Sequence, residues 1–151
     1  MNDVNEKQVS GTHYKVQGIQ HWDYVLTNDV PYMEAQVLKY VSRHRLKGGA
    51  DDLRKAQHFI EKLVAWESEY PHVKRDEEPE ERAPTFTDWV RSCDGPEFSL
   101  APEEIVCMHQ IRFWRKEHGD ARLRTALALL IRMIAELDDA AEPQRNYIDQ
   151  D

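Results

Sequence analysis

The sequence predicts an all-α protein in which two helical hairpins pack as a small helical bundle. Its 151 residues suffice for one domain with a modest apolar core. Glycine and proline are few, 6 and 7 residues, whereas 32% of the residues are charged, a balance typical of helical globular proteins. Apolar residues also recur at helical spacing in several separate stretches. Because each hairpin has one apolar face, packing the two faces together covers both.

The first hairpin is expected over residues 32–70, after a short helix at 19–26. Gly48 and Gly49 end its first helix and reverse the chain, and an aspartate at 51–52 caps its second helix. The apolar positions that predict these two helices are Met33, Val37, Leu38, Val41 and Leu46, then Leu53, Ala56, Ile60, Leu63 and Val64.

A second hairpin follows a stretch rich in proline and charge. A short helix is expected at Phe86–Val90, and then two arms at about 103–117 and 120–140. The apolar stripe of the last arm comprises Leu123, Leu127, Leu130, Ile131, Ile134 and Leu137. We therefore divide the chain into a flexible arm at 1–12, a helical unit at 13–70, an acidic linker at 71–84, the second hairpin at 85–142 and a flexible tail at 143–151.

The two hairpins align at a constant offset of 70 residues. The two interpretations are a degenerate internal repeat and the chance likeness of any two helical hairpins that share apolar spacing and a glycine turn. If the repeat is real, the second hairpin serves as scaffold or as an oligomer interface. The identical pairs include Glu34/Glu104, Arg45/Arg115, Gly49/Gly119, Leu53/Leu123, Arg54/Arg124 and Ala56/Ala126.

Charge and hydropathy exclude several classes of partner. The net charge of −8 opposes binding to a long nucleic acid or to an anionic membrane surface. No apolar run is long enough to span a bilayer, and the N-terminal residues lack the order of a signal peptide, so we expect a cytoplasmic protein. Cys93 and Cys107 are expected to be reduced and structural. The negative charge is uneven, since residues 1–66 hold nine Lys and Arg against eight Asp and Glu.

The first hairpin carries a stripe of cations at Lys39, Arg43 and Lys47, with Tyr40 beside the first of them. Like charges at i, i+4 and i+8 oppose helix formation by a few tenths of a kcal/mol per pair, roughly 0.2–0.5 kcal/mol, so an anion over the stripe would explain it. The alternative is a solvated basic face that pairs with Asp52 and other nearby acids.

A series of polar and aromatic landmarks also runs through this part of the chain. It comprises His13-Tyr14, Ile19-Gln20-x-Trp22-Asp23, Lys39-Tyr40-Val41-x-Arg43, Lys47-Gly48-Gly49 and Asp52-Leu53-x-Lys55-Ala56. With this series, residues 13–66 resemble the SaV-like phage domain family, which includes the small nucleotide kinase of certain podoviruses. The resemblance implies a helical, homo-oligomeric protein that handles deoxynucleoside monophosphates and ATP without the usual phosphate-binding loop. The chain departs from the family pattern at Ala35-Gln36, where a Gly-Asn pair is common.

The resemblance also implies the residues of a site. We expect catalytic roles for Lys39, Arg43 and Asp52, because cations spread the charge of a transferring phosphoryl group. Asp52 is in addition the expected Mg²⁺ ligand or the residue that orients Lys55. The residues expected to bind substrate are His13, Tyr14, Tyr40, Lys47 and Lys55.

Three functions remain open at this point. The first is a phage-type nucleotide kinase in the host cytoplasm, which transfers phosphate from ATP to a deoxynucleoside monophosphate with Mg²⁺. The second is a non-catalytic oligomer that sequesters nucleotides or nucleotide signals against host defence. The third is a Mg²⁺-dependent nucleotide pyrophosphohydrolase, indicated by Glu103-Glu104 and Glu136-x-x-Asp139, although Cys107 replaces the third glutamate of that class. All three bind a small nucleotide.

Overall fold

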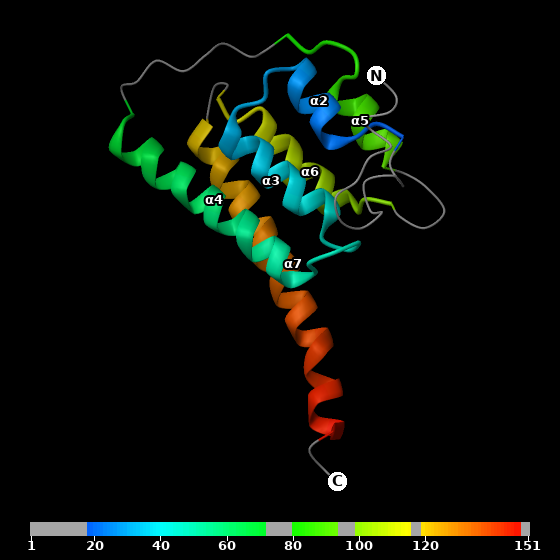
Figure 1. Cartoon of the computed structure of the whole chain (residues 1–151). Helices are drawn as coiled ribbons and strands as arrows, with labels where there is room; N and C mark the ends of the chain where they lie inside the picture. The colour runs from blue at the N-terminus through cyan, green and yellow to red at the C-terminus, as the bar shows by residue number, and fades with distance from the viewer. Residues whose placement is uncertain (1–17, 72–79, 94–98, 116–118, 149–151) are drawn as a thin grey trace.

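The computed structural model describes residues 18–71, 80–93, 99–115 and 119–148, with side chains described as far as Ala141. This part of the chain contains six helices and no strand, which confirms the all-α prediction (Figure 1). The helices are α2 (His21–Thr27), α3 (Tyr32–Arg43), α4 (Ala50–Glu69), α5 (Phe86–Ser92), α6 (Pro102–Arg112) and α7 (Gly119–Ile148).

Four of the helices form the core of the bundle. Helix α3 packs on α4, α4 on α7, α7 on α6, and α6 on α3, so the two hairpins close a ring around one apolar centre. The short helices α2 and α5 pack together beside this ring (Figure 1). In the described part of the chain, no helix is long and apolar enough to span a membrane.

The apolar periodicity correctly predicts most of the core. The fully buried apolar side chains of the ring include Val37, Leu38, Val41, Leu53, Ala56, Ile60, Met108, Ile111, Leu123, Ala126 and Leu130. Two residues of the apolar stripe predicted for the arm at 120–140 are exposed and not buried: Ile131 is 48% exposed and Leu137 is 39% exposed. Leu137 lies in the C-terminal half of α7 and lines a cavity shared with the α3–α4 turn and the start of α6.

The helix ends differ from the expected ones. Helix α3 ends at Arg43 and is followed by a turn in which the Leu46 and Lys47 N–H groups both donate to the Arg43 carbonyl. Helix α7 continues to Ile148, so residues 143–148 of the expected tail are helical. The expected arm at 1–12, residues 72–79 of the expected linker and residues 149–151 lie outside the described residues.

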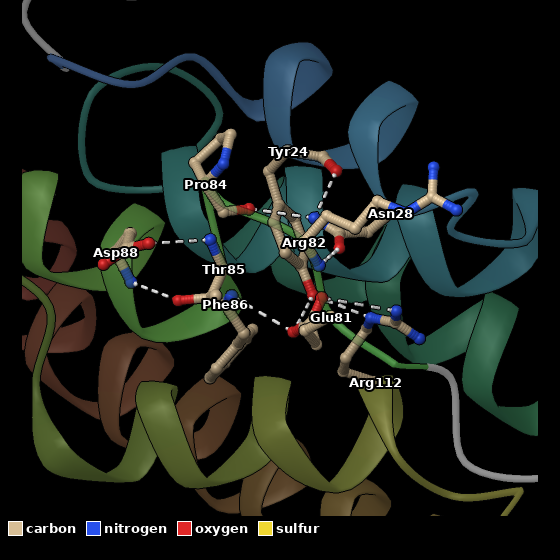
Figure 2. Close-up of polar contacts among 9 residues, drawn as sticks. All are labelled: Tyr24, Asn28, Glu81, Arg82, Pro84, Thr85, Phe86, Asp88 and Arg112. Atoms are coloured by element: carbon tan, nitrogen blue, oxygen red, sulfur yellow. Dashed lines mark hydrogen bonds and ion pairs between the residues drawn. The ribbon is translucent and has the colours of Figure 1, made fainter.

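The end of the expected linker is bound to the bundle (Figure 2). The Glu81 carboxylate accepts hydrogen bonds from the Tyr24 hydroxyl at 2.9 Å and from the Phe86 N–H at 3.1 Å. Arg112 of α6 donates to the same Tyr24 hydroxyl at 2.7 Å. The Asn28 side chain accepts from the Arg82 N–H and donates to the Pro84 carbonyl. Burial raises the pKa of Tyr24, which keeps its hydroxyl protonated as a donor.

The two hairpins also exchange equivalent contacts. Near the start of α3, the buried Glu34 carboxylate accepts from Trp114 Nε1 at 2.6 Å and from Arg115 Nε at 3.0 Å, just after α6. Near the start of α6, buried Glu104 pairs with Arg45 and lies 3.7 Å from His44 Nε2, just after α3. An offset of 70 relates each member of one set to a member of the other. A duplication would produce this reciprocity, and it stays a prediction.

Candidate functional site

Three cations converge on the ring of Tyr40. Lys39 Nζ lies 5.4 Å from the ring centroid, Arg43 Cζ 4.8 Å and Lys55 Nζ 5.4 Å. Lys39, Tyr40 and Arg43 come from the C-terminal half of α3, and Lys55 comes from the first turns of α4. Each distance lies within the range of a cation–π contact. We call this group, together with the carboxylate that joins it, the Tyr40 cluster: Lys39, Tyr40, Arg43, Asp52 and Lys55.

Asp52 is the buried centre of that cluster. Its carboxylate accepts hydrogen bonds from Arg43 Nε at 3.1 Å and Nη2 at 3.4 Å, and from the Gly48 N–H at 3.1 Å. Lys55 Nζ lies 3.6 Å from Asp52 Oδ1. A Cβ atom at position 48 would lie 2.2 Å from Asp52 Cγ, so only glycine allows the turn to pass this close. Asp52 therefore fixes the Arg43 guanidinium and ties the turn to α4.

These contacts bear on the expected Mg²⁺ role of Asp52. Both carboxylate oxygens face cationic groups or a backbone donor, and only 1% of the residue is exposed. A metal ion would have to displace Arg43 and Lys55 from the carboxylate, at the cost of leaving a buried charge unpaired. The geometry fits the orienting role that was also expected of Asp52, and it does not fit a metal ligand.

The cluster carries an excess of positive charge. It contains three cationic side chains and one carboxylate, and within the described residues Lys39 has no carboxylate within ion-pair distance. Lys55 is exposed, and Lys39 is partly exposed. Such an excess on a protein of net charge −8 is a local site of attraction for a small anion.

A partly buried histidine, His21, lies near these cations, and sequence reasoning missed it. His21 of α2 donates through Nε2 to the Ala35 carbonyl at 2.8 Å, and its ring packs edge-on to Trp89 at 5.6 Å. Its pKa is lowered to about 4, mainly by burial and to a smaller extent by the charges of Lys39 and Arg43, although the hydrogen bond to Ala35 raises it. A neutral imidazole therefore stands near the cluster, and a single histidine in a short helix gives no signal for this in the sequence.

Aromatic side chains extend the cluster along the α3–α4 surface. Phe59 of α4 stacks on Tyr40 with ring centroids 6.1 Å apart and planes 18° apart. Tyr32 at the start of α3 meets the other side of Phe59 edge-on at 6.2 Å, and 68% of Tyr32 is exposed. We call Tyr32, Phe59 and Tyr40 the aromatic row. It joins residues of two helices, so spacing along one helix did not reveal it.

Lys47 does not join the Tyr40 cluster. Because α3 ends at Arg43, Lys47 lies in the following turn and lines a cavity of about 700 Å³. The expected cationic stripe is therefore divided between two places. The other polar residues around the cavity are His44, Arg45, Asp51, Arg54, Glu103, Glu104, Glu136 and Asp138.

This cavity brings together most of the acids expected for a pyrophosphohydrolase. Glu103, Glu104 and Glu136 line it, together with Asp138 in place of the expected Asp139. Glu104 is paired with Arg45, and burial raises its pKa. Within the described residues, no group of three or more His, Cys, Asp or Glu has the arrangement of a metal site.

Two expected site residues, His13 and Tyr14, lie outside the described residues, so their substrate-binding role stays a prediction. Of the remaining expected residues, Lys47 lines the separate cavity. The others, Lys39, Tyr40, Arg43, Asp52 and Lys55, form the Tyr40 cluster.

Comparison with known proteins gives a family match for one segment of the chain. No curated protein and no solved structure matches the chain significantly. Residues 9–61 match the model of a family described as protein of unknown function, DUF3310. That description assigns no activity and names no nucleotide kinase. The matched segment covers α2, α3 and the first part of α4, so a DUF3310 domain at residues 9–61 contains the whole Tyr40 cluster and the aromatic row.

Proposed function

We propose that the Tyr40 cluster binds the phosphate of a nucleotide and that the adjoining Tyr40–Phe59 stack receives its base. One observation carries this proposal: cations from two helices converge on one aromatic ring, with a single buried carboxylate among them. Phosphate binding by arginine and lysine beside an aromatic stacking surface is the usual chemistry of nucleotide recognition.

The parts of the cluster contribute differently to such binding. Asp52 holds the Arg43 guanidinium through two hydrogen bonds, so little side-chain entropy is lost when Arg43 meets a phosphate. Lys39 and Lys55 approach from opposite helices and add two mobile ammonium groups. The Tyr40–Phe59 stack offers a flat apolar surface, and stacking of a base on such a surface contributes about 1–3 kcal/mol.

Phosphoryl transfer from ATP to a deoxynucleoside monophosphate is the activity that the resemblance implies for this site. Asp52 does not fit as a Mg²⁺ ligand, so the contacts support binding more directly than turnover. Sequestration of nucleotides by a homo-oligomer needs only the binding surface, and it is the second candidate.

Isothermal titration with deoxyadenosine monophosphate tests the binding proposal. We expect the double variant Lys39→Ala/Lys55→Ala to bind roughly 5- to 30-fold more weakly, because two charge-assisted contacts of about 0.5–1 kcal/mol each are lost. Lys47→Ala is the matched control, since Lys47 belongs to the same expected stripe but lines the separate cavity. Equal affinity of the double variant and the control would refute the proposal.

Incubation with ATP, Mg²⁺ and each deoxynucleoside monophosphate separates the candidate activities. Diphosphate formation that Lys39→Ala abolishes would establish a kinase, whereas binding without turnover would establish sequestration. Release of pyrophosphate from a nucleoside triphosphate that Glu104→Gln abolishes would instead assign the chemistry to the cavity between the α3–α4 turn, α6 and α7.

A further inference from the structure

We infer that the preferred ligand of this site is a dinucleotide, whose two bases lie along the aromatic row. The inference rests on the proposed function and specifies its class of ligand. It follows from the length of the aromatic row, from the exposure of Tyr32 at its far end and from a further cation, Lys62, beside it.

The aromatic row is longer than one nucleotide needs. Tyr32 and Tyr40 are eight residues apart on α3, which corresponds to about 12 Å along the helix axis. Phe59 fills the interval, with ring centroids 6.1 Å from Tyr40 and 6.2 Å from Tyr32. A base that stacks beside the cations at Tyr40 leaves Tyr32 uncovered, and Tyr32 is the most exposed ring of the row at 68%. A second base would cover it.

Polar groups accompany the row over its whole length. Lys62 follows Lys55 by seven residues and Phe59 by three, so the three side chains share one face of α4. Lys62 is exposed, and within the described residues it has no ion-pair partner. Gln36 stands one helical turn from both Tyr32 and Tyr40 on α3, and its amide can donate and accept hydrogen bonds at a base edge. Phosphate groups can therefore be held at both ends of the row.

The same surface does not favour a longer strand. The row contains three rings, and the protein as a whole carries a net charge of −8, which repels an extended polyanion. Two bases joined by one phosphodiester and bearing a 5′-phosphate match the row and its flanking cations.

Titration calorimetry with three probes tests the inference: deoxyadenosine monophosphate, the 5′-phosphorylated deoxyadenosine dinucleotide and a deoxyadenosine decanucleotide. We expect the dinucleotide to bind roughly 5- to 100-fold more tightly than the monophosphate, the gain of one further stacked base. Tyr32→Ala should remove this gain and leave the affinity for the monophosphate unchanged, whereas Tyr32→Phe should retain it. Lys62→Gln should weaken only the dinucleotide. Tyr70→Ala, which removes an exposed ring outside the row, just after the C-terminal end of α4, is the matched control.

The outcomes separate this inference from the proposed function. If the monophosphate binds and the dinucleotide binds no more tightly, or if Tyr32→Ala weakens both equally, the dinucleotide inference is wrong and the proposed function stands. If neither ligand binds, both proposals fail. A decanucleotide that binds far more tightly than the dinucleotide would overturn the inference in favour of a single-stranded nucleic acid.

Discussion

The two hairpins have the same arrangement of helices, but the equivalent faces of α3 and α6 carry different kinds of residue. In the first hairpin, the face that carries Lys39 and Arg43 keeps its charges beside Tyr40. At the corresponding positions of the second hairpin, His109 and Phe113 pack on each other at 4.7 Å, and Phe86 of α5 meets both rings. Phe113 is buried there, whereas His109 stays exposed. The comparison shows how one helical framework can present a charged face in one half and an aromatic contact in the other.

The residues near the two hairpin turns also differ. Trp114 is fully buried, and a Cβ atom at Gly119 would lie 2.3 Å from its carbonyl oxygen. In the first hairpin the smaller His44 occupies the position equivalent to Trp114 and lines the cavity of about 700 Å³.

The largest expected effect is on the buried ion pair of Arg43 and Asp52 in the first hairpin, whose counterparts at the offset of 70 are Phe113 and Arg122. Asp52→Ala leaves the Arg43 side chain, which is 10% exposed, without its carboxylate, and should lower the free energy of unfolding by about 3–5 kcal/mol. Arg122 is the counterpart of Asp52 at the offset of 70, and Arg122→Ala should change the free energy by less than about 0.5 kcal/mol. Urea unfolding measures both. Similar losses in the two variants would contradict this difference between the hairpins.

A pH effect should come next in size. The pKa of His21 is lowered to about 4 in the folded protein, so between about pH 4 and 6.5 it stays neutral while the same histidine in the unfolded chain binds a proton. The contribution of His21 to the free energy of unfolding is therefore complete above about pH 6.5 and is lost as the pH falls toward 4. Its part of the loss amounts to at most about 3 kcal/mol. His21→Asn should flatten the stability profile over this interval.

The control for this effect is His58→Asn, which removes an exposed histidine of α4. Glu104 has the opposite sign, because its raised pKa favours the folded state as the pH falls. The difference between the wild type and His21→Asn therefore isolates the histidine. An unchanged profile in His21→Asn would show that His21 is not the group responsible.

Glu34 and Glu104, which make the equivalent contacts between the hairpins, should affect the free energy of unfolding less, and Glu34 more than Glu104. Glu34→Ala leaves the buried Trp114 N–H without an acceptor and should cost about 2–3 kcal/mol, whereas Glu104→Ala should cost about 1–2 kcal/mol. The second loss is smaller because Arg45, with a side chain 45% exposed, can turn toward water. Thermal unfolding of the two variants under identical conditions gives the order, and a reversed order would contradict it.

The smallest effect is expected at the two thiols. Cys93 and Cys107 are free and buried, and burial raises the pKa of each to about 12. Neither should react with an aromatic disulfide reagent at pH 8 until the chain unfolds, as followed by absorbance. Rapid reaction of one thiol in the native protein would show that its part of the core opens.

The sequence predicts the bundle because apolar spacing determines which helix faces are buried. It predicts helix ends less well, because these depend on contacts across the bundle. Lys47 continues the spacing of Lys39 and Arg43, yet Asp52 holds Arg43 and Gly48 together in a turn that ends α3 first. The one-helix stripe was for this reason wrong about the position of Lys47, and the expected role of Lys47 in binding substrate stays a prediction. The acidic composition of residues 71–84 suggested a linker between two helical units, whereas Tyr24 and Phe86 bind the Glu81 side chain.

The sequence analysis included the charged residues and Tyr40 of the candidate site, and it missed the two other aromatic residues, Tyr32 and Phe59. Lys39, Arg43, Asp52 and Lys55 lie close together in the fold, as the family resemblance implied. Phe59 gave no signal, because its contacts with Tyr32 and Tyr40 cross from α4 to α3. Spacing along one helix reveals neighbours on that helix, and it leaves the partners on the next helix undetermined until the packing is known.

The attachment of residues 81–86 has a consequence for the continuity of the chain. Glu81, Arg82 and Pro84 are tied to α2 and α6, while the interlocked carboxylates Glu34 and Glu104 join α3 to the end of α6 and α6 to the end of α3. A peptide bond cut between Pro71 and Glu80 would therefore leave two fragments that remain associated as one particle. If the chain were divided at the same place and the two halves were produced as separate polypeptides, they should reassemble into one complex. Formation of that complex would show that both halves are present.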